Sequence, residues 1–353
     1  MNLIKYCSII LLMILASSCK KDKPTEAEVP ATLSNGMLVL NEGLFQLNNS
    51  SLSWVNLETG SVDNDYFTNK TGRLLGDTGN DLKKYGGKIY IVVNVSSTIE
   101  VLDAHTGESV KQISMNNGTV GKQPRSITFH QGKAYISCFD GFVDVLDTAS
   151  LEITQRIQVG SNPDHMTIAG NSLFVSNTGG LNSPAMDSTV SVIDLTINSE
   201  IKKITVGLNP GSIELADNGK IYVVTRGNYG SVVSKMVRIS AANLNVDQIY
   251  NYGISNISKF GDKLLLSTFD YGSETQKVSL FDPVADNITN LNFISINQIQ
   301  TLYNVQYVAS QNKIYVIDAK GYTNTGYVHV YSSSGTLLDT YHVGLNPNSI
   351  LIL

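Results

Sequence analysis

Short hydrophobic runs recur along the chain, and most of them have a β-branched or aromatic residue at their centre and a Gly or Asn turn in front. Seven such runs lie at residues 37–40, 88–91, 133–136, 173–175, 220–223, 263–266 and 313–316. Runs of this length and composition, separated by turn residues, predict buried β-strands rather than helices. In five of the seven, a Lys stands at the start of the run.

Two further patterns accompany each run. Val-Gly-x-x-Pro occurs at residues 120–124, 159–163, 206–210 and 343–347, and Tyr252-Gly253 is a degenerate copy. The intervals between the glycines are 39, 47, 46 and 91 residues, and the last is close to two repeats. A short strand that ends in Asp (101–103, 145–147, 192–194 and 280–282) comes next, followed by a turn and an alternating strand such as residues 154–159. Each repeat therefore contains four short strands.

Four antiparallel strands in about 45 residues are the signature of a β-propeller blade. Residues 36–353 hold seven such units, whereas six or eight blades would require one repeat to be misread. The region begins with a second strand at residue 37 and ends with the opening of a repeat. We therefore predict an all-β, seven-bladed propeller in one domain, closed by pairing of residues 348–353 with the blade that begins at residue 36.

The runs at residues 220–225 (KIYVVT) and 173–177 (LFVSN), together with the Asn-Pro turns that precede strands, resemble the YVTN or YncE-like propellers. The resemblance covers nearly all of the chain after the N-terminal segment and implies the propeller fold. Trp-Asp and Gly-His signatures are lacking, and Trp54 is the single Trp, so the chain does not resemble a WD40 protein.

The N-terminus has the features of a secretory signal. A basic Lys5 precedes the apolar residues 6–15, and the small residues 16–18 stand directly before Cys19. This arrangement resembles a lipoprotein signal of Bacteroidetes-type bacteria, which implies lipidation of Cys19; the alternative is a plain signal peptide with a coincidental Cys. We expect residues 1–18 to be the signal peptide, 19–35 the lipidated Cys and a flexible tether, and the protein to be an outer-membrane lipoprotein at the cell surface.

Composition and motifs exclude several classes of function. Charged residues are 16% of the chain and the net charge is −5, without a basic tract, so binding to nucleic acid has no electrostatic support. The five His residues are scattered, and no haem, zinc, P-loop or Gly-x-Ser-x-Gly motif occurs. We therefore predict no catalytic residue, no metal and no cofactor. Asp164 and His165 are adjacent, and on an extended strand they would point apart, which argues against an acid–base pair. Cys138 is expected to be a buried apolar residue.

Loop lengths indicate which face of the propeller binds. The turns between first and second strands are tight, whereas the loops between second and third strands are long and varied, as at residues 41–51, 177–188, 226–234, 270–276 and 318–326. Binding residues concentrate on long loops carried by a rigid scaffold. Polar and aromatic side chains gather on this face, although the alternative is that the Asn and Asp side chains merely satisfy turns. The candidate ligand-binding residues are Asn41, Asn80, Asp81, Asn94, Arg125, Asp140, Asp164, His165, Asn177, Arg226, Tyr229, Asp270, Tyr271, Asp318 and Tyr322.

The lipoprotein signal and the polar, aromatic face together resemble the propeller lipoproteins of Bacteroidetes, among them the BtuG type. That resemblance implies capture of a corrinoid (cobalamin, vitamin B12) and association with a TonB-dependent outer-membrane transporter. Two alternatives remain: a protein-interaction scaffold without a small-molecule ligand, and a propeller lyase or lactonase.

Overall fold

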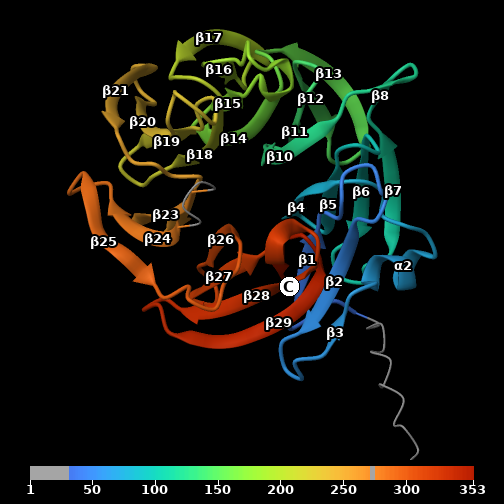
Figure 1. Ribbon diagram of the computed structural model, residues 1–353. Helices are drawn as coiled ribbons and strands as arrows, with labels where there is room; N and C mark the ends of the chain where they lie inside the picture. The colour runs from blue at the N-terminus through green and yellow to red at the C-terminus, as the bar shows by residue number, and fades with distance from the viewer. Residues whose placement is uncertain (1–31, 271–274) are drawn as a thin grey trace, which may run out of the picture.

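The computed structural model describes residues 32–270 and 275–353, and it is a ring of seven four-stranded antiparallel sheets around a central axis (Figure 1). In propellers this axis is the central channel. The predicted all-β, seven-bladed fold is therefore confirmed. In each blade the first strand lines the channel and the fourth lies at the outer edge of the ring.

The blades follow one another along the chain, and the strands of each blade are named from the channel outward. Blade 1 comprises β30 (Pro347–Ile352), β1 (Gly36–Asn41), β2 (Ser51–Asn56) and β3 (Val62–Asp63). Blade 2 comprises β4 (Gly79–Tyr85), β5 (Lys88–Val93), β6 (Thr98–Asp103) and β7 (Ser109–Ser114). Blade 3 comprises β10 (Pro124–His130), β11 (Lys133–Cys138), β12 (Phe142–Asp147) and β13 (Glu152–Gln158). Blade 4 comprises β14 (Pro163–Ala169), β15 (Ser172–Asn177), β16 (Thr189–Asp194) and β17 (Ser199–Thr205).

The remaining three blades complete the ring. Blade 5 comprises β18 (Pro210–Leu215), β19 (Lys220–Thr225), β20 (Lys235–Ser240) and β21 (Asn245–Tyr250). Blade 6 comprises β22 (Asn256–Phe260), β23 (Lys263–Asp270), β24 (Thr275–Asp282) and β25 (Asn287–Ile294). Blade 7 comprises β26 (Leu302–Val308), β27 (Lys313–Asp318), β28 (Thr325–Ser332) and β29 (Leu337–Leu345). Short 3-10 turns at Gly180–Asn182 (η2) and Lys320–Tyr322 (η3) lie in the loops of blades 4 and 7.

The ring closes as the repeat predicts. β30, at the C-terminus, pairs antiparallel with β1, and Ile350 lies opposite Val39. Ile350 is buried against residues of both β1 and β27, among them Val39 and Ile317. The first and last strands of the domain therefore belong to the same sheet.

The hydrophobic core lies between neighbouring blades. Each second strand is covered on both faces, so it reads as a continuous apolar run instead of an alternating one. Tyr90, Tyr135, Tyr222 and Tyr315, the central aromatics of four of these runs, are all at most 1% exposed. The fourth strands are mostly exposed and carry the Lys and Arg residues that discourage pairing with other chains at a sheet edge.

Both sequence markers have a local physical cause. The Asp that ends a third strand caps the next turn: Asp103 accepts hydrogen bonds from the amides of Thr106 and His105, and these bonds lower the pKa of its carboxyl. The Gly of Val-Gly-x-x-Pro lets the end of a fourth strand pass close to the end of the second strand. A Cβ atom on Gly160 would lie 2.4 Å from the side chain of Asn177, which leaves no room for a larger residue.

In the described part of the chain, a helix and a hairpin lie outside the repeat and were not predicted. The helix α2 (Tyr66–Thr71) follows the two-residue outer strand of blade 1, and its buried Tyr66 and Phe67 take part in the core between blades 1 and 2. A small hairpin, β8 (Asn116–Asn117) and β9 (Val120–Gly121), joins blades 2 and 3. Among the described residues, no helix is long and apolar enough to cross a membrane.

Candidate functional site at the mouth of the channel

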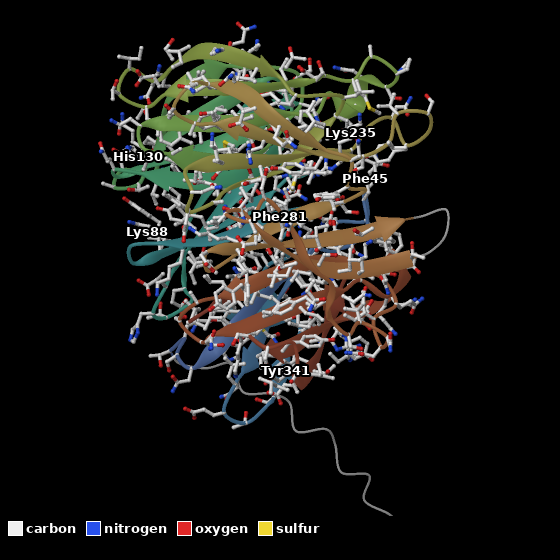
Figure 2. The ribbon with its side chains drawn as sticks, turned by 90° about the vertical axis from the view of Figure 1, so that its left-hand side faces the viewer. Phe45, Lys88, His130, Lys235, Phe281 and Tyr341 are labelled. Atoms are coloured by element: carbon white, nitrogen blue, oxygen red, sulfur yellow. The ribbon has the colours of Figure 1, made fainter. Side chains whose placement is uncertain are left out.

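The two ends of the channel differ in the loops that surround them. Figure 2 shows Phe45 and Lys235 at one end of the ring and Lys88 and His130 at the other. The first end carries the long loops between second and third strands and the connections between blades, and we call it the channel mouth. The second end carries the short turns between first and second strands and between third and fourth strands.

A β-bulge shapes the inner strand of six blades where the strand leaves the mouth. One extra residue interrupts the pairing with the second strand at Asn80, Arg125, Asp164–His165, Gly211–Ser212, Tyr303 and Asn348. β-bulges bend a strand and redirect side chains. In three blades the bulge follows the Pro of the Val-Gly-x-x-Pro marker on β10, β14 and β18, and in blade 1 it follows the same Pro on β30.

The bulge in blade 4 places a buried carboxylate at the centre of the site. Asp164 is 2% exposed, and its side chain lies 3.4 Å from Nε of Arg125, 3.3 Å from Nη1 of Arg226 and 3.2 Å from Nδ1 of His165. Burial alone would raise the pKa of Asp164, but the charges of His165, Arg125 and Arg226 outweigh it and hold the pKa well below its usual range. Asp164 is therefore an ionised group shared by residues from three blades.

The expectation that Asp164 and His165 point apart is wrong. The bulge breaks the strict alternation of the strand, so both side chains lie on the same side and the ring nitrogen Nδ1 reaches Oδ2 of Asp164. The imidazole itself remains 45% exposed.

Glu42 and Tyr303 form a second hydrogen-bonded pair at the mouth, which the sequence analysis did not predict. Oη of Tyr303 donates a hydrogen bond of 2.5 Å to Oε2 of Glu42, which follows β1. Burial raises the pKa of Glu42, the Tyr303 hydrogen bond and the charge of Arg125 act against that rise, and the charge of Asp164 adds to it. The ring of Tyr322 packs edge-on against Tyr303, with 5.9 Å between the ring centroids.

Hydrogen bonds from side chains connect every neighbouring pair of blades at this level. Asn348 of blade 1 donates to the carbonyl of Gly79 in blade 2 (2.6 Å), and Arg125 of blade 3 donates to Asn80 in blade 2 (2.7 Å). Arg125 and Arg226, from blades 3 and 5, both donate to Asp164 in blade 4. The remaining contacts run from the amide of Ile257 in blade 6 to Ser212 in blade 5 (3.1 Å), from Asn256 in blade 6 to Asn304 in blade 7 (2.8 Å), and from Asn304 to the carbonyl of Asn348 in blade 1 (2.9 Å). The amides of this circuit are used to hold the blades together. The guanidinium groups of Arg125 and Arg226 are also partly exposed, at 23% and 28%.

Four predicted site residues are buried and make hydrogen bonds within or between blades, so they are not available to a ligand. Asn41 and Asn177 are fully buried and donate to hydroxyl groups of their own third strands, Ser53 and Ser191 among them. Asn94 is 5% exposed and donates to the carbonyl of Pro124. Asp318 is 1% exposed and accepts hydrogen bonds from the backbone amides of Gln300, Thr301 and Lys320.

The other predicted residues divide between the mouth and its surroundings. Asn80, Arg125, Asp164, His165 and Arg226 come together as described, and Asp81 lies beside them, where it accepts a hydrogen bond from the amide of Ile127. Tyr322 lies against Tyr303, and Tyr229 is 71% exposed on the loop of blade 5. Asp140 pairs with Arg156 away from the channel. Asp270 ends β23, whereas Tyr271 and Cys19 lie outside the described residues.

Among the described residues, three loops at the mouth present bulky apolar side chains to solvent, and hydrogen bonds hold each of these loops in place. In the loop of blade 1, Asp77 accepts from the amides of Gln46 and Asn48, so that Phe45 and Leu47 are 68% and 60% exposed. In blade 5, Asn228 accepts from the amides of Gly230 and Val232, and the exposed side chains are Tyr229, Val232 and Val233. In blade 4, the exposed side chain is Leu181.

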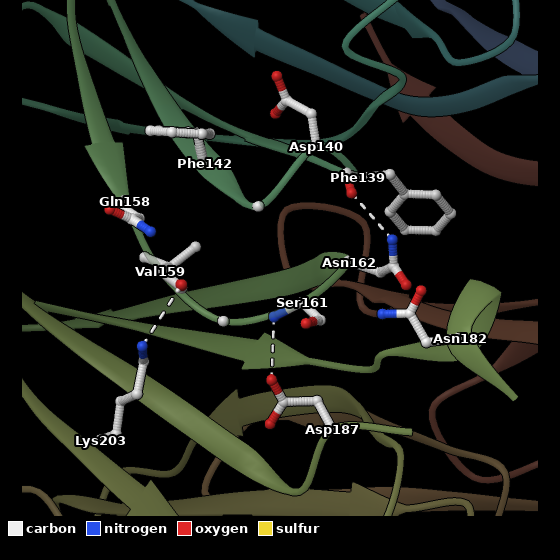
Figure 3. Close-up of a pocket in the computed structure, with 12 residues that line it drawn as sticks. Phe139, Asp140, Phe142, Gln158, Val159, Ser161, Asn162, Asn182, Asp187 and Lys203 are labelled. Carbon is white, nitrogen blue, oxygen red and sulfur yellow. Dashed lines mark hydrogen bonds between the residues drawn. The ribbon is translucent and has the colours of Figure 1, made fainter. Parts of the chain in front are cut away.

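A shallow cleft of about 480 Å³ lies between blades 3 and 4 on the same face (Figure 3). Asp140, Asn182 and Lys203 contribute to its polar lining. Asn162 donates to the carbonyl of Phe139 across it, and Asp187 accepts from the amide of Ser161. No group of three His, Cys, Asp or Glu residues that could hold a metal ion occurs in residues 32–270 and 275–353.

Comparison with known families gives one match. A family described as a domain of unknown function (DUF5074) matches residues 35–263. The chain belongs to this family. The match covers blades 2 to 5 and the strands that open blade 1, so the matched region includes most of the channel mouth. A comparison with curated proteins finds no match.

Solved structures show the same fold at low sequence identity. The DUF5074 chain is similar to a quinoprotein alcohol dehydrogenase-like protein from Bacteroides thetaiotaomicron, with a TM-score of 0.68 and 16% identity over 91% of this chain and 79% of that one. It is also similar to hydrazine synthase of Kuenenia stuttgartiensis (TM-score 0.61, 14% identity, 74% of this chain and 85% of that one). BamB from Moraxella catarrhalis gives a TM-score of 0.53 at 14% identity, over 91% of this chain and 86% of that one.

Proposed function

We propose that this protein is a ligand-binding propeller of the bacterial surface, and that it binds a large polar nutrient at the channel mouth. The observation that carries the proposal is the convergence of Arg125, Asp164 and Arg226 from three blades on one point beside the open channel. An Asp that only caps a turn accepts hydrogen bonds from nearby backbone amides and does not require two guanidinium partners from other blades. Convergent polar groups in a concave site are the usual mark of a binding site.

A corrinoid is the ligand that we propose, delivered to a TonB-dependent outer-membrane transporter. The support is the resemblance of the N-terminal segment and the repeats to BtuG-type lipoproteins, together with the chemistry of the mouth. The amide side arms of a corrin offer both donors and acceptors of hydrogen bonds, which suit Arg, Asp, His and Tyr side chains. Aromatic faces such as that of Tyr322 can contact the flat macrocycle.

Isothermal titration of the mature chain, expressed without its lipid, against cyanocobalamin tests this proposal. We expect heat that saturates at one ligand per chain, and loss of most of the affinity in the variant Tyr322→Ala. The matched control is Tyr341→Ala, which removes a Tyr from the outer strand β29 of the same blade. Absence of heat together with absence of co-elution on gel filtration would exclude the corrinoid.

A second candidate, a protein-interaction scaffold, is favoured by the exposed apolar side chains on the three loops. Phe45, Leu181 and Tyr229 are each more than 60% exposed, although they belong to hydrogen-bonded loops. Exposed apolar groups that gather on one face mark contact surfaces. Native mass spectrometry of a pull-down separates the candidates: a scaffold loses its partner in Phe45→Ala and keeps it in Tyr322→Ala, whereas a ligand-dependent complex is lost in both variants.

A further inference from the structure

The arginines of the channel mouth differ from the arginines that stabilise the blades. Arg73 makes two hydrogen bonds to the buried Glu100, at 2.8 and 2.6 Å, in the bidentate geometry of a strong ion pair. Arg125 and Arg226 each reach Asp164 through a single nitrogen at 3.4 and 3.3 Å. Charge-assisted hydrogen bonds are normally about 2.7–2.9 Å long. The guanidinium groups of the mouth are therefore less tightly paired with their carboxylate than Arg73 is.

Within the described residues, most of their hydrogen-bond donors have no partner. A guanidinium group has five N–H donors. Among the described residues, Arg226 donates only to Asp164, and Arg125 donates to Asp164 and Asn80. The two side chains are 28% and 23% exposed, so their remaining donors have access to the mouth.

The backbone of blade 5 makes room for one of the two groups. A Cβ atom built on Gly211 would lie 2.3 Å from the central carbon of the Arg226 guanidinium, so Arg226 rests directly on this glycine. The guanidinium of Arg125 lies 4.8 Å from the ring centroid of Phe139, in a cation–π contact that holds it in place. Both groups are thus positioned by neighbours other than their carboxylate partner.

Carboxyl groups also lie near the two guanidinium groups. Asp164 is shared by both, and Asp81 accepts a hydrogen bond from the amide of Ile127 beside them. Glu42 faces Tyr303 of β26, Arg125 of β10 and Asp164 of β14, and burial raises its pKa. Protonation of Glu42 therefore reduces the negative charge near the two arginines.

We propose that Arg125 and Arg226 together bind an anionic group of the ligand, a phosphate, phosphodiester or carboxylate. The inference rests on the proposed function only in placing the ligand at the channel mouth; it holds for any ligand that carries such a group. Arginine is the side chain best suited to oxyanions, because its planar donors match the spacing of their oxygens.

Inorganic phosphate is the first probe, with chloride at the same ionic strength as the reference. Phosphate should raise the melting temperature of the wild-type protein relative to chloride. Its dissociation constant should rise about tenfold or more in Arg226→Gln, since that change removes at least one charge-assisted hydrogen bond. Gly211→Ala should weaken phosphate binding as well, because it displaces the guanidinium without changing the charge. The control Lys133→Gln removes one positive charge at the opposite end of the channel and should leave phosphate binding unchanged.

A second pair of probes separates this inference from the proposed function. Cyanocobalamin contains a phosphodiester, and dicyanocobinamide has the same corrin ring without it. We expect wild type to prefer cyanocobalamin and Arg226→Gln to lose that preference. Equal binding of both corrinoids by both proteins would overturn the anion site while leaving corrinoid capture intact. Binding of phosphate without binding of either corrinoid would uphold the anion site and reject the corrinoid, and equal phosphate effects in all variants would overturn the inference outright.

The affinity for phosphodiester ligands should also depend on pH. Deprotonation of Glu42 adds a negative charge near the anion, so affinity should fall as pH rises through the pKa of Glu42. Glu42→Gln should weaken this dependence, because its amide is neutral at every pH. The same pH dependence in wild type and Glu42→Gln would contradict this part of the inference.

Discussion

Replacement of Asp164 by Asn tests the electrostatics of the channel mouth. The substitution keeps the shape of the side chain and removes its negative charge. Asp164 is 2% exposed, and it is the shared acceptor of Arg125, Arg226 and His165. The variant should therefore be less stable than wild type at neutral pH. It should also bind anions more tightly, since one negative charge has left the mouth.

The size of the destabilisation follows from the geometry. Removing one partner of a fully buried ion pair costs about 3–5 kcal/mol. The contacts to Asp164 are 3.2–3.4 Å long and both guanidinium groups are about a quarter exposed, so solvent screens the exposed part of the interaction. We expect a loss of about 1.5–3 kcal/mol at pH 7, the range of a hydrogen bond to a charged group.

The pH dependence gives the sharper test. The folded-state pKa of Asp164 is depressed, so its contribution to stability is complete above the unfolded-state pKa of about 3.9 and is lost as pH falls toward the folded-state pKa. The difference between wild type and Asp164→Asn should not decrease between pH 7 and pH 5. Below about pH 3.9 it should shrink by about 1.4 kcal/mol per pH unit.

Urea unfolding monitored by Trp54 fluorescence measures both quantities. The matched control is Asp140→Asn, which removes a partly exposed charge on the same face that is paired with the partly exposed Arg156; it should cost less than about 1 kcal/mol and leave phosphate binding unchanged. Equal stabilities of wild type and Asp164→Asn at pH 7, or a difference of the same size at pH 7 and pH 3, would refute the reasoning.

Four further predictions concern the ring, the thiol, the loops and the anchor. Ile350→Ala should lower the free energy of unfolding by about 2–4 kcal/mol because this residue is buried at the ring closure; Leu338→Ala, at an exposed site of β29, should cost less than about 0.5 kcal/mol in the same urea titration. Cys138 is buried and burial raises the pKa of its thiol, so in a Cys19→Ala background a thiol reagent at pH 8 should label it only after unfolding; rapid labelling of that native variant would contradict the burial of Cys138. Phe45→Ala should leave the unfolding midpoint unchanged and weaken partner binding, whereas loss of stability would show that Phe45 packs in the fold. Cys19→Ala should move the protein from the membrane fraction to the soluble fraction, and an unchanged distribution would argue against lipidation.

The sequence predicts the ring well because each blade repeats a local pattern. The second strands are continuous apolar runs, the Gly of Val-Gly-x-x-Pro reflects a close contact between strands, and the Asp at the end of a third strand caps a turn. Each of these causes acts within one repeat. Closure by β30 could be predicted because the last repeat begins at Val343 and has only its first strand.

The site is less visible in the sequence because it is made by contacts between repeats. Glu42 and Tyr303 lie 261 positions apart and meet only because the ring closes. Asp164 and His165 were expected to diverge, and the bulge in β14 brings them together. Asn177 ends a second strand, which is why it was predicted as a ligand-binding residue. In the structure its amide donates to Thr189 and Ser191 of the neighbouring third strand and is buried there.

The point at which the chain enters the ring bears on how the proposed lipoprotein would be oriented at a membrane. The amide of Leu33 donates to the carbonyl of His105, in a turn at the end opposite the channel mouth, and β1 starts at Gly36 at that same end. If Cys19 carries lipid, the bilayer lies on the side of the short turns. The intervening 13 residues can span at most about 45 Å. The mouth would then face away from the bilayer, toward the medium. A transporter in the same bilayer could contact the mouth only if the propeller rotates on its tether.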